Sequence, residues 1–191
     1  MSRRRRTKTA TRVAERLPGD RAAANLVERM IRVDHAGEYG AARIYDGQLT
    51  VLKSATAIAA VERMAAQERR HLETFGQLVA ERRVRPTALS PLWHTAGYAL
   101  GVATALLGES AAMACTVAVE ETIDEHYRRQ LEALGDDEPG LAKTIADFRA
   151  DELEHRDTAL AHGARETPGY PLLSAAIKTG SRLAIWLSTR I

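Results

Sequence analysis

The chain has 191 residues, of which 45% are hydrophobic and 27% charged, and its formal net charge is +2. This composition excludes a disordered chain and is typical of one compact domain with a sizeable core. Cys115 is the only cysteine, which excludes an intrachain disulfide and a metal site built from several cysteines, so a reducing compartment is expected.

The first 21 residues are predicted to be a basic, flexible arm, and residues 22–191 a single domain. The stretch MSRRRRTKTATR carries only basic charges, and no acid precedes Glu15. Such a stretch is compatible with a targeting peptide or with a tail attracted to anionic lipid or nucleic acid. We favour the tail, because the stretch is short and lacks an apolar segment. No nucleic-acid partner is expected.

The rest of the chain shows helical periodicity almost throughout and no strand-like alternation, which predicts an all-α fold. Proline, glycine and capping residues divide it into six expected helices. These helices span residues 22–52, 56–83, 91–107, 110–134, 139–164 and 171–189. The strongest breaks are RVRPTALSP (83–91), GDDEPG (135–140) and ETPGYP (166–171).

Four of the expected helices carry a carboxylate on the apolar stripe that should face the core. These residues are Glu38, Glu68, Glu120 and Glu152, in the first, second, fourth and fifth helices. A single inward glutamate often reaches the surface or pairs with a basic side chain. Burying an unpaired carboxylate is costly, so four of them on core faces require protonation, pairing or a bound cation.

Two of the glutamates belong to E-x-x-H motifs, Glu68 with His71 and Glu152 with His155. Residues three apart lie side by side on a helix, with Cβ atoms roughly 5 to 6 Å apart. One such motif arises easily by chance, but this chain contains two. Glu38 precedes Glu68 by 30 residues and Glu120 precedes Glu152 by 32, which indicates an internal repeat.

The repeat predicts two antiparallel helical hairpins. If each glutamate faces the E-x-x-H motif that follows it, the turns fall midway, near residues 53 and 136. LKSAT (52–56) offers Ser54 or Thr56 as an N-cap, and GDDEPG is rich in turn-forming residues. Two such hairpins make a four-helix bundle in which all six side chains meet at one level.

The six side chains predict a dimetal centre. A glutamate from each of two helices and an E-x-x-H motif from each of the other two are typical of di-iron and di-manganese carboxylate proteins. Two divalent cations would neutralise four carboxylates, and the mixed imidazole and carboxylate ligands favour iron or manganese over magnesium, calcium or structural zinc. We favour iron. The predicted ligands are Glu38, Glu68, His71, Glu120, Glu152 and His155.

Three further residues are weaker candidates for a substrate pocket or for support of the ligands. His126 and its neighbour Tyr127 are candidates to line a cavity above the metals. Asp151 directly precedes Glu152 and is either an acceptor that orients a ligating histidine or a solvated acid. The other histidines, His35, His94 and His162, are expected to be ordinary core or surface residues.

Residues 87–108 carry no charge, which raises the question of a membrane span. A span there would separate the two halves of the metal centre, so we expect a helix lying against the bundle or in a membrane interface. The last helix is also amphipathic, with Leu173, Ile177, Ala184 and Leu187 on one stripe. Core packing and membrane contact both fit that pattern.

Four stretches resemble the demethoxyubiquinone hydroxylases of ubiquinone biosynthesis. They are IRVDHAGEYGAARIYDGQL (31–49), RVRPTALSPLWHTAGYALGVATALLG (83–108), ACTVAVEETIDEHY (114–127) and FRADELEHRD (148–157). The resemblance runs from about Arg29 to the C-terminus and leaves out the basic arm. It implies a ferritin-like four-helix bundle with two additional apolar or amphipathic helices. It also implies a di-iron monooxygenase that uses O2 to hydroxylate the ring of a polyprenyl demethoxyubiquinol.

The resemblance further implies two iron ions per chain. One iron would be bound by Glu38, Glu68 and His71. The other would be bound by Glu120, Glu152 and His155. Glu68 and Glu152 would bridge the two irons. The expected location is peripheral, on the cytoplasmic side of a bacterial inner membrane or the matrix side of the mitochondrial one. The two extra helices would form an apolar mouth for the prenyl tail, and a lipid-binding accessory protein of the same pathway is a candidate partner.

Several alternatives remain open from the sequence. Electrons would come from the quinol itself or from a nicotinamide, although no dinucleotide fingerprint indicates a tightly bound donor. Prenyl length and oligomeric state are not readable. Rival functions are iron storage, hydroxylation of modified tRNA, and a metal-free helical membrane adaptor.

Overall fold

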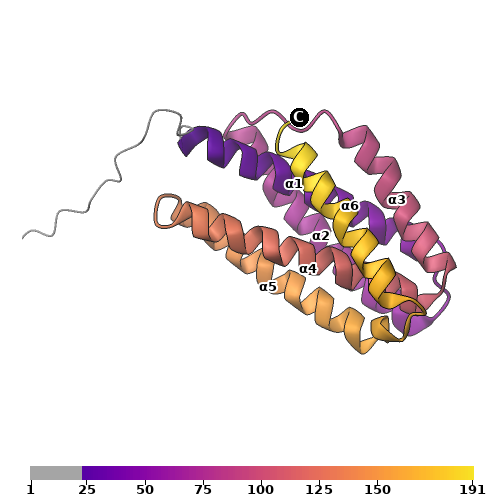
Figure 1. The fold of residues 1–191 in the computed structure, drawn as a ribbon. Coiled ribbons are helices and arrows are strands. Elements are labelled where there is room, and N and C mark those ends of the chain that lie inside the picture. Colours follow the sequence, from indigo (N-terminus) through magenta and orange to yellow (C-terminus); the bar gives the residue numbers. More distant parts are fainter. Residues whose placement is uncertain (1–22) are drawn as a thin grey trace, which may run out of the picture.

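A computed structural model describes residues 23–191, so the predicted basic arm lies outside the described residues (Figure 1). Over this range the chain forms six α-helices and one short 3₁₀ segment and has no strand, which confirms the all-α prediction. The helices are α1 (Ala23–Leu49), α2 (Ala55–Glu81), α3 (Ser90–Leu106), α4 (Glu109–Leu134), α5 (Pro139–Ala161) and α6 (Tyr170–Ser188).

The expected end of the fifth helix at residue 164 is wrong. Helix α5 ends at Ala161, because Gly163 adopts a left-handed conformation with φ 79° and the chain continues as the 3₁₀ segment η1, Ala164–Glu166. Glycine carries no Cβ penalty in this conformation and is a common helix terminator.

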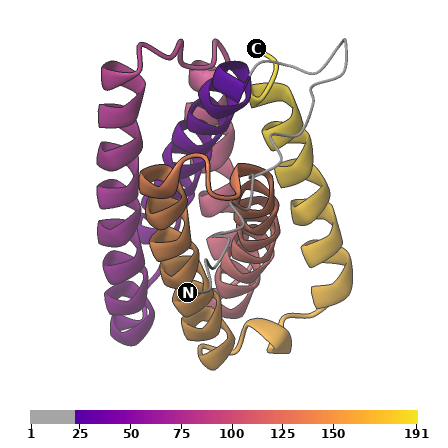
Figure 2. The same cartoon turned by 90° about the vertical axis from the view of Figure 1, so that its left-hand side faces the viewer.

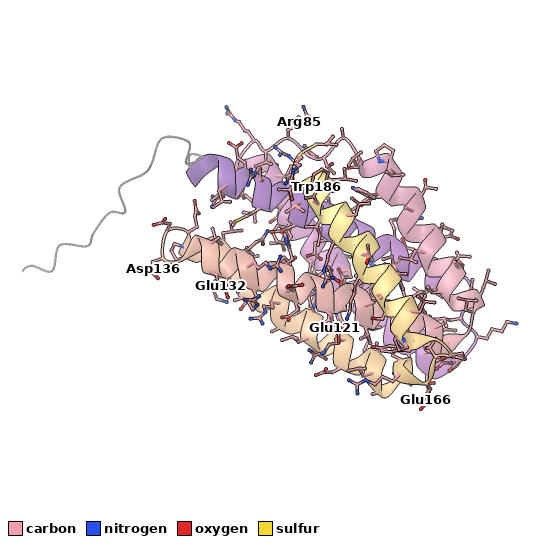
Figure 3. All side chains as sticks on the ribbon, in the orientation of Figure 1. Arg85, Glu121, Glu132, Asp136, Glu166 and Trp186 are labelled. Carbon is pink, nitrogen blue, oxygen red and sulfur yellow. The ribbon has the colours of Figure 1, made fainter. Side chains whose placement is uncertain are left out.

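Helices α1 and α2 form one hairpin and α4 and α5 the other, and the two hairpins pack together as a four-helix bundle. The turns lie at residues 50–54 and 135–138, at the two predicted midpoints. Ser54 caps α2 by accepting a hydrogen bond from the backbone N–H of Ala57, at 3.4 Å. Gly135 ends α4 with φ 53°, and Asp136 lies in the turn that follows (Figure 3).

The bundle interior consists of two apolar clusters. One contains Phe75 of α2, Tyr127 of α4 and Ile145 of α5. The other contains Val61 of α2 and Met113 of α4. Along α2 and α5 the buried E-x-x-H motifs fall between these clusters, so the bundle holds a polar layer between two apolar layers.

Helix α3 lies directly against α1, and glycines make the close approach possible. A Cβ atom at Gly101 would overlap the backbone oxygen of Ile44, and one at Gly47 would overlap that of Tyr98. The uncharged segment 87–108 therefore packs on the bundle, one of the two placements expected for it. Across residues 23–191, no helix combines the length and apolar character that crossing a bilayer requires.

Helix α6 packs on α4 and α1, and Figure 2 shows it at the opposite edge of the molecule from α2. It is joined to α3 by a hydrogen bond of 2.9 Å from Trp93 Nε1 to Ser188 Oγ. Within α6, Ile177 is buried, whereas the other three residues of its predicted stripe are partly exposed. Large apolar side chains exposed on or next to α3 and α6 are Leu92, Leu106, Leu107, Leu172, Leu183 and Trp186 (Figure 3 labels Trp186).

Candidate metal centre

The polar layer brings together all six residues predicted as ligands. Glu38 comes from α1, Glu68 and His71 from α2, Glu120 from α4, and Glu152 and His155 from α5, and each is at most 1% exposed. They form two groups of four, and within each group the potential ligand atoms lie within 4.8 Å of one another. One group is Glu38, Glu68, His71 and Glu152, and the other is Glu68, Glu120, Glu152 and His155. Glu68 and Glu152 belong to both.

Both imidazoles point Nδ1 into the layer. His71 Nδ1 lies 3.3 Å from Oε2 of Glu38 and 3.3 Å from Oε1 of Glu152. His155 Nδ1 lies 3.2 Å from Glu68 Oε1 and 3.2 Å from Glu152 Oε2. Glu152 thus presents one oxygen to each histidine, so it could offer an oxygen to a cation in either group.

The atoms that face one another in this layer lack hydrogen-bond partners among the described residues. They are Glu38 Oε2, both carboxylate oxygens of Glu68 and Glu152, Glu120 Oε2, and Nδ1 of His71 and His155. Buried polar atoms are normally paired, so this concentration of unpaired acceptors indicates a site for a positively charged group. Two divalent cations would match the four carboxylates in charge, and the donor set fits iron or manganese.

The protonation behaviour of the metal-free layer supports the same conclusion. Burial and the facing carboxylate of Glu152 raise the pKa of Glu68 and of Glu120 well above its ordinary value. Burial alone would lower the pKa of His71, but the carboxylates of Glu152 and Glu38 raise it to about 10. Burial alone would raise the pKa of Glu152, yet His155 and His71 lower it to about 2. Without cations, protons offset the concentrated negative charge.

Two tyrosines hold the outer glutamates in place. Tyr45 of α1 donates a hydrogen bond of 2.6 Å to Glu120 Oε1 on α4, and Tyr127 of α4 donates to Glu38 Oε1 on α1. Each tyrosine lies seven residues after the glutamate of its own helix and donates its hydrogen bond to the glutamate of the other helix. The internal repeat therefore extends beyond the ligands to the groups that orient them.

Outward-facing groups orient the two histidines. His71 Nε2 lies 3.0 Å from Oδ2 of Asp151, and His155 Nε2 lies 3.1 Å from Oε1 of Gln67. Phe148 stacks on the His71 ring with a centroid distance of 3.9 Å. Because Nε2–H can be donated outward, the Nδ1 lone pairs are free to face a cation.

Of the weaker candidates, Asp151 and Tyr127 thus contact His71 and Glu38, two of the predicted ligands, whereas His126 lies outside both groups. His126 Nε2 is 3.1 Å from Asp34 Oδ1 and 3.0 Å from Gln130 Nε2, and it lines a separate cavity of about 200 Å³. The other three histidines also lie outside both groups.

Sequence reasoning missed Tyr45 and Gln67 as site residues, although both had a signal in the repeat. Tyr45 has the same seven-residue offset from Glu38 that Tyr127 has from Glu120. Gln67 precedes Glu68 as Asp151 precedes Glu152. Aligning the two halves of the chain on their E-x-x-H motifs would have found Gln67.

An apolar groove of about 310 Å³ is enclosed by helices α1, α3, α4 and α6. Its walls include Gly37 and Ala41 of α1, Trp93 and Leu100 of α3, Val119 and Ile123 of α4, and Gly180 and Ala184 of α6. Gly37 and Val119 are the sequence neighbours of Glu38 and Glu120, so the groove and the polar layer share the walls formed by α1 and α4. An elongated apolar molecule in this groove would lie next to the centre.

Comparison with known proteins adds independent findings. Residues 25–188 match the family model described as ubiquinone biosynthesis protein COQ7. The chain is 59% identical over 178 residues to a 3-demethoxyubiquinol 3-hydroxylase of Rhodospirillum rubrum, covering 93% of this chain and 84% of that protein. Two mitochondrial proteins, each named NADPH-dependent 3-demethoxyubiquinone 3-hydroxylase, are also similar. The one from Dictyostelium discoideum is 47% identical (97% of this chain, 87% of the relative), and the one from Homo sapiens 50% identical (86% and 78%).

Proposed function

The chain belongs to the COQ7 family of ubiquinone biosynthesis proteins, and we propose that it is the 3-demethoxyubiquinol 3-hydroxylase of its pathway. The observation that carries this assignment is the buried layer of four glutamates and two histidines, grouped around two positions that share Glu68 and Glu152. A hydroxylase that uses O2 needs a redox-active centre shielded from water, and this layer is the part of the described chain suited to hold one.

We infer that the two positions bind iron, through Glu38, Glu68, His71 and Glu152 on one side and Glu68, Glu120, Glu152 and His155 on the other. The unpaired carboxylate oxygens and Nδ1 atoms support this inference, as does the balance of four negative charges by two divalent cations. Two ferrous ions bound there would supply the electrons and Lewis acidity that activation of O2 requires.

The protein side chains position these ligands and keep the site dry. Tyr45 and Tyr127 fix the carboxylates of Glu120 and Glu38, and Asp151 fixes the ring of His71. The apolar clusters on either side of the layer exclude water. In a dry, preorganised site, charge interactions are stronger and side reactions with solvent are suppressed.

The substrate is a demethoxyubiquinol, and we propose that it occupies the apolar groove between α1, α3, α4 and α6. The groove's apolar walls suit a prenyl tail. A ring inserted past Gly37 and Val119 would reach the side of the layer formed by Glu38 and Glu120. No charged side chain lines the groove, which fits a neutral quinol.

We further propose that α3 and α6 rest on a membrane surface, from which a prenylated quinol enters the groove. Support comes from the exposed Leu106, Leu172 and Trp186 and from the position of the groove between these two helices. An apolar helix face beside a basic residue is typical of interfacial binding, and here Arg190 lies over the ring of the exposed Trp186. The membrane is either a bacterial inner membrane, on its cytoplasmic side, or the mitochondrial inner membrane, on its matrix side, and a lipid-binding accessory protein remains a candidate partner.

Ring hydroxylation converts a C–H bond to C–OH and reduces the second oxygen atom of O2 to water, which consumes two electrons and two protons. The mitochondrial relatives are named NADPH-dependent, so reduced nicotinamide is the first donor to test, with the quinol as the alternative.

The test is anaerobic loading of metal-free protein with Fe(II), followed by ¹⁸O₂ and a short-tailed demethoxyquinol, with and without NADPH. We expect a product that carries one ¹⁸O atom and depends on iron. The matched inactive control is Glu152→Gln, which replaces one carboxylate oxygen of a residue shared by both positions without changing side-chain size. Unlabelled or unchanged quinol with iron-loaded protein would refute the assignment.

A further inference from the structure

The outward contacts of the two histidines follow a crossed pattern. Asp151 on α5 contacts His71 on α2, and Gln67 on α2 contacts His155 on α5. Each contacting residue directly precedes the E-x-x-H glutamate of its own helix, and its side chain lies within hydrogen-bond distance of the histidine of the other helix. The two contacts are therefore equivalent by the internal repeat, with Nε2 to oxygen distances of 3.0 and 3.1 Å.

The equivalent positions differ in chemistry, because one holds a carboxylate and the other a neutral amide. The two halves match in two further contacts, although Phe148 stacks on His71 whereas Tyr45 meets His155 edge-on. Both histidines present Nδ1 to the layer, and each outer glutamate accepts a hydrogen bond from a tyrosine of the facing helix. The side chain of Asp151 is 33% exposed, so water screens part of its charge. Asp151 nevertheless places a carboxylate acceptor behind His71. The acceptor behind His155 is the neutral amide of Gln67.

A histidine that donates Nε2–H to a carboxylate is a stronger electron donor through its other nitrogen than one that donates to an amide. The negative charge also attracts a cation bound on the far side of the ring. Both effects favour the position next to His71 over the one next to His155.

We propose that the two metal positions are inequivalent: the Glu38–His71 position binds its divalent cation more tightly and fills first, because Asp151 supports His71 while Gln67 supports His155. This proposal rests on the dimetal site of the proposed function. It makes Asp151 and Gln67 positioning residues that act through the histidines and do not touch the metal.

The experiment titrates metal-free protein with Co(II) under anaerobic conditions and follows binding by calorimetry and visible absorption. The wild-type chain should bind two equivalents in two steps of unequal affinity. Asp151→Asn should weaken the tighter step by about 10- to 100-fold, the range seen when the group behind a ligating histidine is removed. Gln67→Glu should strengthen the weaker step.

Two variants separate a charge effect from a structural one. Asp151→Glu keeps the carboxylate and should retain the tighter step within about threefold, whereas a purely structural role would make it as harmful as Asp151→Asn. The double variant D151N/Q67E keeps the total charge of the layer and its surroundings. It should restore two unequal steps, with the tighter one now shifted to the Glu120–His155 position.

The assignment of each step comes from single ligand variants. His155→Ala should remove the weaker step in the wild-type chain and the tighter step in the double variant. Circular dichroism checks that every variant keeps its helix content. Equal affinities in the wild-type chain, or an effect of Asp151→Asn on the weaker step alone, would overturn the proposal.

The titration uses neither O2 nor quinol, so its outcome is separable from that of the hydroxylation test. Two unequal steps in a protein that fails to hydroxylate the quinol would leave the inequivalence standing and refute the proposed reaction. Absence of Co(II) binding within the layer would refute both.

Discussion

The hydroxyl group of Tyr45 donates a hydrogen bond of 2.6 Å to Oε1 of Glu120, and both residues are buried where α1 faces α4. The bond leaves Glu120 Oε2 as the unpaired oxygen that faces the layer. Burial and the surrounding carboxylates raise the pKa of Tyr45 well above its ordinary value, so the phenol stays protonated and remains a donor.

Replacing Tyr45 with Phe should therefore weaken metal binding without unfolding the protein. Removing one buried hydrogen bond costs on the order of 1 to 2 kcal/mol, and Glu120 gains rotational freedom. We expect about a tenfold loss in affinity for one of two Co(II) equivalents, measured by calorimetry. Thr50→Val, which removes a hydroxyl that bonds only to the backbone at the end of α1, is the control and should bind both equivalents normally.

Glu68→Gln should stabilise the metal-free protein and abolish its stabilisation by metal. Burial and the other carboxylates raise the pKa of Glu68 well above its ordinary value, so this carboxyl group must take up a proton when the metal-free chain folds, and a neutral glutamine avoids that cost. We expect a rise of about 1 to 2 kcal/mol, or roughly 2 to 8 °C in melting temperature, for the chelator-treated protein. Added Mn(II) or Fe(II) should then produce no further rise.

The matched control for this variant is Glu73→Gln, which changes an exposed residue of the same helix. It should leave both the metal-free melting temperature and the metal-induced rise unchanged. A metal-free Glu68→Gln protein that melts below the wild type would contradict the idea that the layer is electrostatically strained.

The metal-free protein should become less stable as the pH rises from 6 to 9. The pKa of His71 is raised from 6.5 to about 10, so its contribution is complete below pH 6.5 and is lost as the pH rises through 10. Glu68 and Glu120, with raised pKa values, also bind more protons in the folded state and act in the same direction. Glu152, whose pKa is lowered to about 2, contributes stability that is lost only as the pH falls towards 2.

Thermal melts of chelator-treated protein at pH 6, 7.5 and 9 measure this dependence. Divalent metal should have the opposite trend, raising the melting temperature more at pH 8 than at pH 6, because cations compete with protons for the same ligands. A metal-free melting temperature that is flat or increases over this range would show that the layer is not protonated as described.

Filling the groove should impair quinol binding and leave the metal centre intact. Gly180 lines the groove, and a Cβ atom there would meet no heavy atom within 4 Å, so we expect Gly180→Leu to be accommodated by filling part of the groove. We expect KM for a demethoxyquinol to rise about tenfold, which corresponds to about 1.4 kcal/mol of lost binding. Steady-state kinetics on iron-loaded protein measure it.

Gly140→Leu is the matched control, since a Cβ there also meets no heavy atom within 4 Å but the residue lies at the start of α5, outside the groove. It should leave KM unchanged. Equal kinetics for the two variants would place the quinol elsewhere.

Placing a charge on the outer face of α6 should reduce membrane binding. Leu183 and Trp186 are 56% and 52% exposed, and burying a side chain of this kind in lipid contributes roughly 1.5 to 3 kcal/mol. Leu183→Glu should lower sedimentation with vesicles of inner-membrane lipid at least tenfold, while activity on a detergent-solubilised, short-tailed quinol persists. Ala66→Glu, an exposed position on α2, adds the same charge at the opposite edge and should sediment like the wild type (Figure 2).

The sequence predicted those features that depend on helical periodicity and local turn chemistry. The turns near residues 53 and 136 were predictable because two independent signals agreed. The midpoints between the paired glutamates fall where the sequence contains turn-forming residues. The convergence of the six donors follows from the same spacing. Their role as metal ligands stays a prediction, as does the domain boundary at residue 22.

Features that depend on contacts between distant segments were not predictable in the same way. The role of Gly97 and Gly101 in the close approach of α3 to α1 depends on where α3 docks, which no local pattern in the sequence indicates. The contact of His126 with Asp34 joins residues 92 positions apart and belongs to no periodic pattern. Which face of α6 is exposed was equally undetermined, because an amphipathic stripe fits a core or a lipid surface.

The two apolar clusters hold α2 and α5 both above and below the polar layer, so the separation between the facing helices does not depend on what occupies the layer. Small zinc domains behave differently, because the ion itself assembles the chain. If cations bind at the proposed positions here, the two apolar clusters would already hold the helices around them, and the ions would enter a preformed cage. On the proposed function, cofactor insertion would then be a late step of maturation, and a cell short of iron would accumulate folded apoprotein.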